Sequence, residues 1–302
     1  MGWLFISFFL HSLFVLVSLS AIASGTPKLI LDFSDLKLRN FRMCSNIEKL
    51  TNVNTKGLSD LKCSGSAQLS VEGFAELKKH IKSEQIADID LRQESHGFIN
   101  NKYPISWYGK HNWDNIGKSL LEINTDELIK LNALPGASPV SFVCKKSSFS
   151  TKFNVQLVHT EGNIAAKNHY IYIRLPVANY CMPDNKTVNE FVKLVAGLPK
   201  NVWYHFHCRA GMGRTTTFMS MFDMMYNAGT IPLDEILKRQ YLLGGTNLTK
   251  IDARNSKKIN LCKKERLIFL KEFYQYCLEN KRNKFKTSWT DWEKEKNEKF
   301  FR

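Results

Sequence analysis

Acidic residues are scarce in this chain of 302 residues. Its 28 Asp and Glu residues face 43 Lys and Arg residues, which leaves a formal net charge of +15 at pH 7. Such an excess favours a polyanionic partner, either nucleic acid, an anionic membrane surface or a heavily phosphorylated small molecule; a basic surface that only serves solubility is the alternative. No internal repeat, no Gly-, Ser- or Pro-rich linker and no Cys-x-x-Cys pair occurs, which excludes repeat scaffolds and the usual zinc-binding spacings. Hydrophobic residues at 43% and aromatic residues at 12% exclude a disordered or collagen-like chain and indicate a folded one.

Charge is absent altogether from the first 24 residues. Residues 3–19 are mostly apolar, and Ala21-Ile22-Ala23 then supplies small residues at the spacing of a signal-peptidase site. We therefore expect a signal peptide over residues 1–23, although no basic residue precedes the apolar run. An uncleaved membrane anchor is the alternative, because the run approaches the roughly 20 residues that a spanning helix needs. The expected product is an exported protein, periplasmic or secreted, that stays anchored to a membrane only if the leader is retained.

The remaining residues, 24–302, predict one α/β domain with an insert. Apolar runs and period-two alternation at residues 140–145 and 153–159 indicate short strands, and Glu161-Gly162-Asn163 indicates a turn. These segments predict a small antiparallel β-rich insert at about 137–176. The other predicted strands are residues 86–91, 170–175 and 202–207, and the predicted helices are residues 69–82, 187–195, 215–226 and 267–278.

One loop carries the residues of a phosphoryl-transfer site, His-Cys-Arg-Ala-Gly-Met-Gly-Arg-Thr-Thr at residues 207–216. Gly211 and Gly213 let the backbone curl so that its N–H groups form an anion-binding nest, and the following helix adds its positive N-terminal end. Such surroundings lower the pKa of a thiol, so Cys208 is predicted to be a thiolate that attacks phosphorus. Arg214 can hold two phosphoryl oxygens with its planar fork, and Thr215 can donate a hydrogen bond to the sulfur. A Walker loop is excluded here, because no Gly-Lys-Ser/Thr follows.

The loop resembles the signature H-C-x-x-G-x-G-R-T of cysteine-dependent phosphatases. Further segments are similar to those of the protein-tyrosine-phosphatase-like (PTP-like) phytases, which hydrolyse inositol polyphosphates. These segments are Asn40-Phe41-Arg42, the block Asp-Leu-Arg-Gln-Glu-Ser-His-Gly-Phe at residues 90–98, Trp107-Tyr108-Gly109, and residues 286–292. The resemblance implies a PTP-like core, in which helices flank a central mixed sheet, together with a small partial β-barrel that agrees with the predicted insert.

The resemblance also implies a set of substrate-binding residues. Arg42 and Asp90 match family positions that line the pocket, and Lys257 and Lys258 stand where related enzymes bring basic side chains over the inositol ring; a solvated surface pair is the alternative for the two lysines. Arg209 departs from the family, in which the residue after the cysteine is commonly acidic. The loop residues predicted to contact phosphate are Arg209, Ala210, Gly211, Met212, Gly213 and Thr215.

The general acid is the point at which this sequence departs most from the family. PTP-like phytases carry an Asp a few residues before a Trp-Pro pair, but here Asn179 occupies that position and the pair is Met182-Pro183. An amide has no proton to give to a leaving alkoxide. Asp184 follows Pro183 directly and is predicted to take over this role; the alternative is that the acid is absent.

The sequence therefore predicts an inositol polyphosphate phosphatase that works through a phosphocysteine intermediate, with Cys208, Arg214 and Asp184 as its catalytic residues. A phosphatase of the same mechanism that acts on phosphotyrosine or phosphoinositides is one alternative. A weakly active module that only binds a phosphorylated ligand is another. No cofactor, metal ion or nucleic acid is expected to take part.

Overall fold

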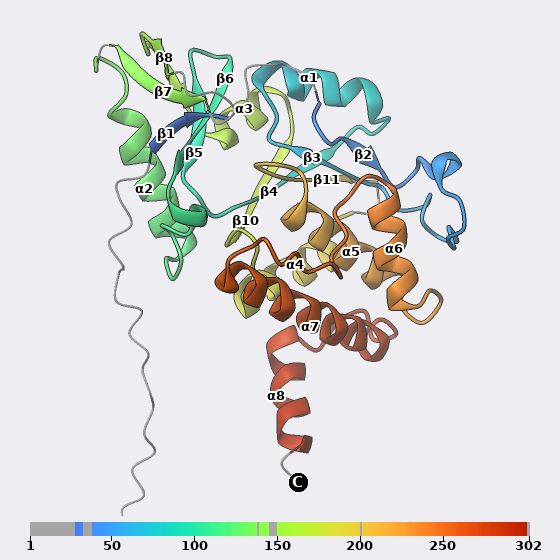
Figure 1. Cartoon of the computed structure of the whole chain (residues 1–302). Coiled ribbons are helices and arrows are strands. Elements are labelled where there is room, and N and C mark those ends of the chain that lie inside the picture. Colours follow the sequence, from blue (N-terminus) through green and yellow to red (C-terminus); the bar gives the residue numbers. More distant parts are fainter. Residues whose placement is uncertain (1–27, 33–37, 138, 145–149, 200, 301–302) are drawn as a thin grey trace, which may run out of the picture.

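The computed structural model describes residues 28–32, 38–137, 139–144, 150–199 and 201–300. The predicted signal peptide lies outside these residues. The described part is built around two sheets with helices packed against them (Figure 1).

The central sheet has five strands in the order β10-β4-β11-β3-β2. The first four strands are parallel, and β2 runs antiparallel to β3. Parallel strands in the middle of a sheet are covered on both faces, which explains why every residue of β4 and β11 is buried. The strand bounds are Arg42–Met43 (β2), Cys63–Ala67 (β3), Ile86–Arg92 (β4), Ile171–Val177 (β10) and Trp203–Cys208 (β11). The predicted mixed sheet is confirmed.

Helices cover both faces of this sheet (Figure 1). One face carries α4 (Asn185–Gly197), α5 (Gly213–Asn227), α6 (Leu233–Leu242), α7 (Lys257–Asn280) and α8 (Trp289–Phe300). These helices share one hydrophobic core, in which Phe191, Phe206 and Phe218 pack edge to face or tilted. The other face carries α1 (Val71–His80) and α3 (Glu161–Lys167), which enclose a second, smaller core.

The second sheet differs from the predicted insert in its bounds and in its pairing. It has six strands in the order β8-β7-β1-β6-β5-β9, and β1 pairs parallel with β7. Its strands are Lys28–Leu31 (β1), His96–Ile99 (β5), Tyr103–Tyr108 (β6), Val140–Cys144 (β7), Ser150–Phe153 (β8) and Val158–His159 (β9). Helix α2 (Leu120–Asn132) packs against it, and short 3-10 turns occupy Ile47–Lys49 and Lys110–Asn112.

Residues 137–176 therefore do not form a separate antiparallel unit. Strand β10, which begins within this range, belongs to the central sheet, and half of the second sheet comes from residues 28–108. The predicted turn at Glu161-Gly162-Asn163 is also wrong. These residues begin helix α3, because Thr160 and Asn163 form a reciprocal capping box at its N-terminus.

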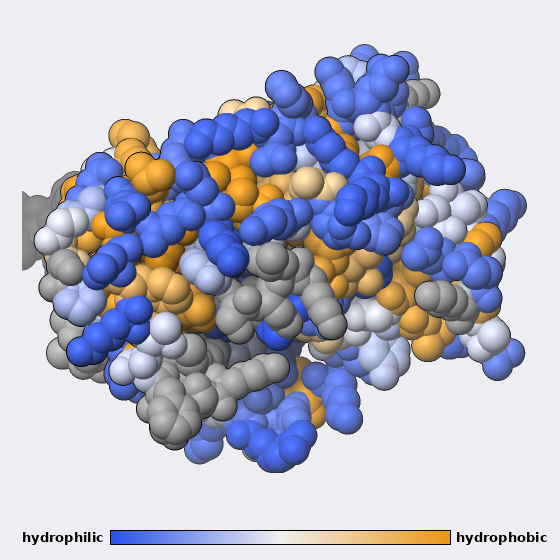
Figure 2. Space-filling model, turned by 90° about the horizontal axis from the view of Figure 1, so that it is seen from above, coloured by the Kyte–Doolittle hydropathy of each residue, from blue (hydrophilic) through white to orange (hydrophobic). Residues whose placement is uncertain are grey.

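Figure 2 shows the face of the molecule that lies above α1 in Figure 1, where hydrophilic side chains predominate and hydrophobic ones appear between them. Among the residues that the structure describes, no helix combines the length and the apolar character needed to cross a membrane.

Candidate active site

The nucleophile loop joins the end of β11 to the start of α5. Strand β11 ends at Cys208, and α5 begins at Gly213, so the residues between them form a turn at the carboxyl end of β11. Gly211 has a φ of 68°, and a Cβ atom there would lie 2.3 Å from the backbone nitrogen of Ala67. Only glycine allows both this left-handed conformation and this close approach to β3. The predicted turn of the backbone is thus set by packing against the neighbouring strand.

Two side chains at the start of β2, the buried Arg42 and the exposed Asn40, hold this loop. Arg42 donates from Nη1 to the carbonyl oxygen of Gly211 at 2.7 Å and from Nη2 to the hydroxyl of Thr216 at 3.1 Å. Asn40 donates to the carbonyl oxygen of Ala210 at 2.8 Å. Arg42 is 3% exposed and is absent from the pocket lining. The prediction that Arg42 binds substrate is therefore corrected, because its guanidinium is used to turn loop carbonyl groups away from the pocket.

Cys208 has the surroundings of a thiolate. Its side chain is buried, and Thr215 donates a hydrogen bond from Oγ1 to the sulfur at 3.3 Å. Burial alone would raise the pKa of the Cys208 thiol, but the positive charge of Arg214 and the hydrogen bonds from Thr215 lower the pKa below its usual value. The thiolate is thus favoured at a lower pH than for a free cysteine.

Arg214 is fixed by a carboxylate to which the sequence analysis gave no role. Its Nη1 and Nη2 atoms donate to the two carboxylate oxygens of Glu94 at 2.6 and 2.9 Å, and both side chains are buried. Burial raises the pKa of a carboxyl group, but Arg214 and Arg92 hold the pKa of Glu94 well below its usual range, so Glu94 is charged. The Nε–H group of Arg214 has no hydrogen-bond partner among the described residues. It is therefore available for a phosphoryl oxygen.

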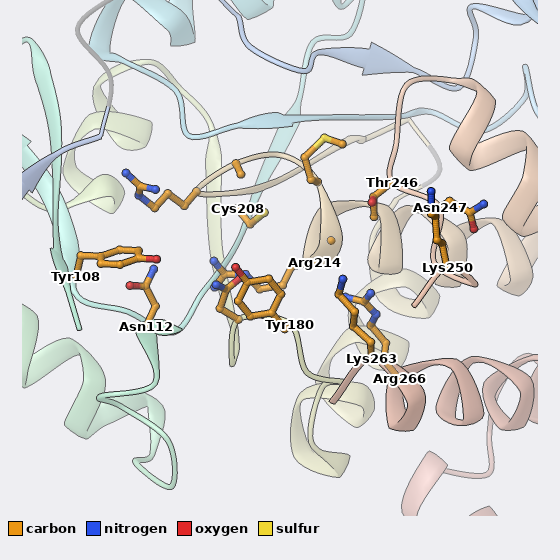
Figure 3. A pocket seen from close by; sticks show the side chains of 15 residues that line it. Tyr108, Asn112, Tyr180, Cys208, Arg214, Thr246, Asn247, Lys250, Lys263 and Arg266 are labelled. Atoms are coloured by element: carbon orange, nitrogen blue, oxygen red, sulfur yellow. The ribbon is translucent and has the colours of Figure 1, made fainter. Parts of the chain in front are cut away.

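A cavity of about 210 Å³ opens over Cys208. Figure 3 shows Tyr108 and Asn112 on one side of Cys208, and Lys263 and Arg266 rising from α7 on the other. Of the predicted loop residues, Arg209, Ala210, Met212 and Gly213 line the cavity, whereas Gly211 and Thr215 lie in the loop behind its surface. The full lining consists of Tyr108, Asn112, Asn179, Tyr180, Cys208, Arg209, Ala210, Met212, Gly213, Arg214, Thr246, Asn247, Lys250, Lys263 and Arg266.

The basic side chains over the cavity are not the predicted lysines. Lys257 and Lys258 are the first two residues of α7, are exposed, and are absent from the lining, whereas Lys263 and Arg266, further along the helix, belong to it. A Cβ atom on Gly213 would lie 3.1 Å from Nη1 of Arg266, so this guanidinium stands directly against the nucleophile loop. The prediction that Lys257 and Lys258 bind substrate is therefore corrected: the basic side chains at the cavity are Lys263 and Arg266, which lie further along α7.

Arg266 is a buried cation without a carboxylate partner among the described residues. It is 3% exposed, and it makes neither a hydrogen bond nor an ion pair in this part of the chain. Burial lowers its pKa to about 10, although the charge of Cys208 acts in the opposite direction. Burial and the charge of Arg266 also lower the pKa of Lys263. By contrast, Arg209 is paired with Asp32, whose Oδ1 atom accepts from Nε at 2.6 Å. The α7 side of the cavity thus carries a buried cation, Arg266, that has no carboxylate partner in the described part of the chain, and a bound anion would offset the cost of burying it.

Asp90 lies beneath the pocket rather than in it. Its carboxylate accepts hydrogen bonds from the backbone N–H of Arg92 and from the hydroxyl of Tyr172, and it lies 3.3 Å from both His96 and Arg174. Burial would raise the pKa of Asp90, but His96 and Arg174 hold it well below its usual range. The prediction that Asp90 binds substrate is corrected: its side chain is fully buried in an ionic network under the loop.

Asp184 is the N-cap of helix α4. Its carboxylate accepts a hydrogen bond from the backbone N–H of Thr187 at 2.7 Å, its side chain is exposed, and it is absent from the cavity lining. The predicted role of Asp184 as general acid is therefore corrected, since a Pro-Asp pair before a helix is also the pattern of an N-cap. Asn179 does line the cavity, and its side-chain N–H donates to the carbonyl oxygen of His111 at 3.3 Å.

A disulfide connects two walls of the cavity. Cys181, next to the lining residue Tyr180, is bonded to Cys262, next to the lining residue Lys263. Cys208 is among the cysteines with a free thiol, which agrees with its predicted role as nucleophile. The bond thus holds the segment that contains Asn179 against α7.

Two buried groups have the residue types and spacing that could hold a metal ion. One is formed by Asp88, Glu161 and His207, and the other by Asp90, His96 and Glu161; within each group the ligand atoms lie within 4.8 Å of one another. None of these residues belongs to the cavity lining. They are not part of the site at which a phosphate could meet Cys208.

Comparison with known proteins places this site in a family. A family model of PTP-like phytases, described by the words inositol hexakisphosphate, matches residues 138–226. The solved structure of a PTP-like phytase from Bdellovibrio bacteriovorus is 30% identical in sequence and has a TM-score of 0.74. The match covers 89% of this chain and 95% of the chain of that phytase. The chain belongs to the PTP-like phytase family. The predicted resemblance and the predicted PTP-like α/β core are confirmed.

Two further relatives are longer than this chain. The PTP-like myo-inositol phosphatase from Mitsuokella multacida, solved in complex with myo-inositol-(1,3,4,5)-tetrakisphosphate, is 33% identical with a TM-score of 0.80; the match covers 89% of this chain and 49% of that one. The effector protein hopD2 of Pseudomonas syringae pv. tomato is 28% identical over 85% of this chain and 56% of its own length. The chain thus spans about half the length of these two relatives.

Proposed function

We propose that this protein is a phosphatase that removes phosphate groups from inositol polyphosphates through a phosphocysteine intermediate. The observation that carries the proposal is the position of the Cys208 thiol, which shares one cavity with Arg214 and with the additional cations Lys250, Lys263 and Arg266. The family relatives support the substrate class, since one was solved with an inositol tetrakisphosphate.

The geometry supports a two-step reaction. The thiolate of Cys208 attacks phosphorus and breaks the bond to the ring oxygen, which leaves as an alkoxide and takes up a proton. During this step the N–H groups of the loop and the Nε–H of Arg214 bind the phosphoryl oxygens. Water then attacks the phosphocysteine, and the sulfur leaves as a thiolate that the hydrogen bond from Thr215 stabilises. Catalysis of this kind depends mainly on positioning and on stabilisation of the charge on the phosphoryl oxygens.

The remaining cations fit a ligand with several phosphate groups. A monophosphate would occupy the loop and leave Lys250 and Lys263, on the outer part of the cavity, without a phosphate group. A ring with neighbouring phosphates would place a second anion there. This charge arrangement favours an inositol polyphosphate over a phosphotyrosine peptide, which carries one phosphate on a flat ring.

Phosphate release from inositol hexakisphosphate and from a phosphotyrosine peptide tests the proposal. We expect release from the hexakisphosphate by the wild type and none by Cys208→Ser, because covalent catalysis needs the thiolate. The Cys208→Ser variant should still bind the hexakisphosphate, since the loop and Arg214 remain. Release by Cys208→Ser within about tenfold of the wild type would overturn the assignment of the nucleophile, and a preference for the peptide would overturn the substrate class.

A binding module without turnover is a second candidate, and Asn179 favours it. The cavity would then bind a phosphorylated ligand without hydrolysing it. Tight binding of the hexakisphosphate without any Cys208-dependent phosphate release, from this or another phosphate substrate, would support this candidate.

We further infer that the protein acts outside the cytoplasm. The Cys181–Cys262 disulfide is of the kind that persists in oxidising compartments, and a relative carries the name of an effector protein. Localisation of a tagged full-length chain in culture supernatant, periplasm and cytoplasm would test the inference.

A further inference from the structure

The side chain at the acid position of this cavity is an amide. Asn179 lines the cavity beside Tyr180, and its N–H group is engaged by the carbonyl oxygen of His111. The carboxylate that the sequence offers as a replacement, Asp184, caps α4 outside the cavity. Among the described residues that form the lining, no Asp, Glu or His side chain is present.

This composition matters for a phosphate ester of an alcohol. When Cys208 attacks the phosphorus of such an ester, the bond to the ring oxygen breaks and its electron pair stays on that oxygen as an alkoxide. An alkoxide is about as strong a base as hydroxide, since bulk water has a pKa of about 15.7. It therefore needs a proton as it leaves. A carboxyl general acid supplies that proton and is worth roughly 10²–10⁴ in rate.

A phosphoanhydride makes no such demand. Attack by the thiolate on the terminal phosphorus of a diphosphate group breaks the P–O bridge, and the electron pair stays on the inner phosphate. The second pKa of a phosphate monoester is about 6, so this leaving group is stable as a dianion at pH 7. Thiolate and diphosphate trianion give phosphocysteine dianion and phosphate monoester dianion, and water then returns the thiolate and dihydrogen phosphate. Charge and atoms balance in both steps without any proton donor.

We propose that this site preferentially cleaves the phosphoanhydride bond of inositol polyphosphates that carry a diphosphate group, rather than their phosphate esters. The inference rests on the proposed function, since it uses the same nucleophile and the same ring. The cations on the α7 side of the cavity agree with this preference, because a ring that carries a diphosphate group has more negative charge than the hexakisphosphate. Lys250, Lys263 and Arg266 supply cations beyond the Arg214 that the transferred group needs.

The other proton-bearing side chains of the lining are phenols and ammonium groups, such as Tyr108, Tyr180 and Lys263. Such groups lose a proton in water only near pH 10, so they are weaker donors than a carboxyl group at neutral pH. If one of them nevertheless served as the acid, esters and anhydrides would be cleaved at similar rates. The experiment below separates the two cases.

The test compares inositol hexakisphosphate with a diphosphoinositol pentakisphosphate, which differs from it by one added phosphate. Products are separated by ion chromatography after single-turnover reactions at pH 7. We expect the wild type to convert the diphosphate to the hexakisphosphate at least about 100-fold faster than it hydrolyses the hexakisphosphate, the lower bound of the worth of a general acid. Rates within threefold of each other, or a faster ester reaction, would overturn the inference.

Two matched variants sharpen the test. Asn179→Asp restores a carboxyl group and should raise the ester rate at least tenfold, which reduces the preference for the anhydride by the same factor. Asp184→Asn makes the opposite exchange outside the cavity and should leave the preference within twofold of the wild type, because an amide also caps helices well. A loss of preference in Asp184→Asn, or no gain of ester rate in Asn179→Asp, would contradict the inference.

Failure of the proposed function would look different. If neither substrate releases phosphate, or if Cys208→Ser releases it as fast as the wild type, the phosphocysteine mechanism itself is wrong. If the hexakisphosphate is cleaved in a Cys208-dependent way at the rate of the diphosphate, the proposed function stands and only the preference for anhydrides falls.

Discussion

Glu94 and Arg214 form a two-point ion pair beneath the cavity, with N···O distances of 2.6 and 2.9 Å and with both side chains buried. The pair fixes the guanidinium plane and uses both Nη atoms, whereas the Nε–H group has no partner among the described residues. The same carboxylate raises the pKa of the Cys208 thiol, an effect smaller than the lowering by Arg214. Glu94 therefore influences both the arginine that binds phosphate and the thiol that attacks it.

Exchange of Glu94 for Gln should change these two functions in opposite directions. We expect kcat to fall by roughly tenfold, about 1.4 kcal/mol of transition-state stabilisation, because an amide offers one acceptor to a fork that needs two. The acid limb of the kcat/KM profile should move to lower pH, because the charge that raises the pKa of Cys208 is gone. Steady-state rates between pH 4 and 8 measure both. Glu190→Gln, in an exposed pair with Lys193, is the control. An unchanged kcat in Glu94→Gln would show that Arg214 needs no partner.

The nucleophile loop was predictable because its chemistry is local. The residues from Cys208 to Thr215 act through a turn that follows directly from the glycines and from the strand and helix on either side. Their relative positions change little with the rest of the fold. The role of Glu94 was not predictable, because it depends on tertiary structure: its contact with Arg214 spans 120 residues of sequence.

The residues around the loop were harder to predict because their roles depend on direction. Arg42 and Asp90 lie close to the loop, but their side chains face the interior rather than the cavity. The choice between Lys258 and Lys263 depends on the phase of α7, which a pattern of lysines on a solvated helix does not fix. Asp184 satisfies two patterns at once, and the need of helix α4 for an N-cap decides its place.

The disulfide between Cys181 and Cys262 should stabilise the fold and the cavity together. The bond closes 81 residues of chain, for which loop-closure entropy predicts up to about 4.5 kcal/mol. Cys181→Ser should lower the midpoint of thermal unfolding and raise KM for the hexakisphosphate, because two walls of the cavity lose their connection. Reductant should lower the unfolding midpoint of the wild type and leave that of the variant unchanged. A wild type that is insensitive to reductant would speak against a structural role for this bond.

His96 should make stability depend on pH at alkaline values. Burial and Arg92 favour the neutral ring, but Asp90 and Glu127 raise the pKa of His96 to about 10. Because the folded pKa lies above the unfolded value of 6.5, this stabilisation is complete below pH 6.5 and is lost as the pH rises toward 10. Urea unfolding of the wild type at pH 6 and pH 9.5 should show a loss of more than about 1.4 kcal/mol, the equivalent of one pKa unit.

His96→Gln is the comparison for this experiment, since it cannot titrate and should lose less stability between the two pH values. The groups that face the ring also include Glu161 and Arg174. NMR titration of the His96 ring in the folded wild type gives an independent readout. A midpoint below pH 7 would contradict the charged state of His96 in this network.

The lysines that line the cavity should make activity on highly phosphorylated substrates sensitive to salt. Lys250 is exposed and Lys263 half-buried, and the chain carries a net charge of +15, so attraction of a polyanion begins in solvent. Ions screen such attraction over about 8 Å at physiological ionic strength. Between 20 and 300 mM NaCl we expect kcat/KM for the hexakisphosphate to fall at least about tenfold, as for electrostatically steered association, and kcat/KM for an aryl monophosphate to change little.

Lys263→Met should reduce the salt slope for the hexakisphosphate alone, whereas Lys257→Met, on the same helix but outside the lining, should reduce it less. Equal slopes for both substrates would mean that the basic surface does not serve substrate binding.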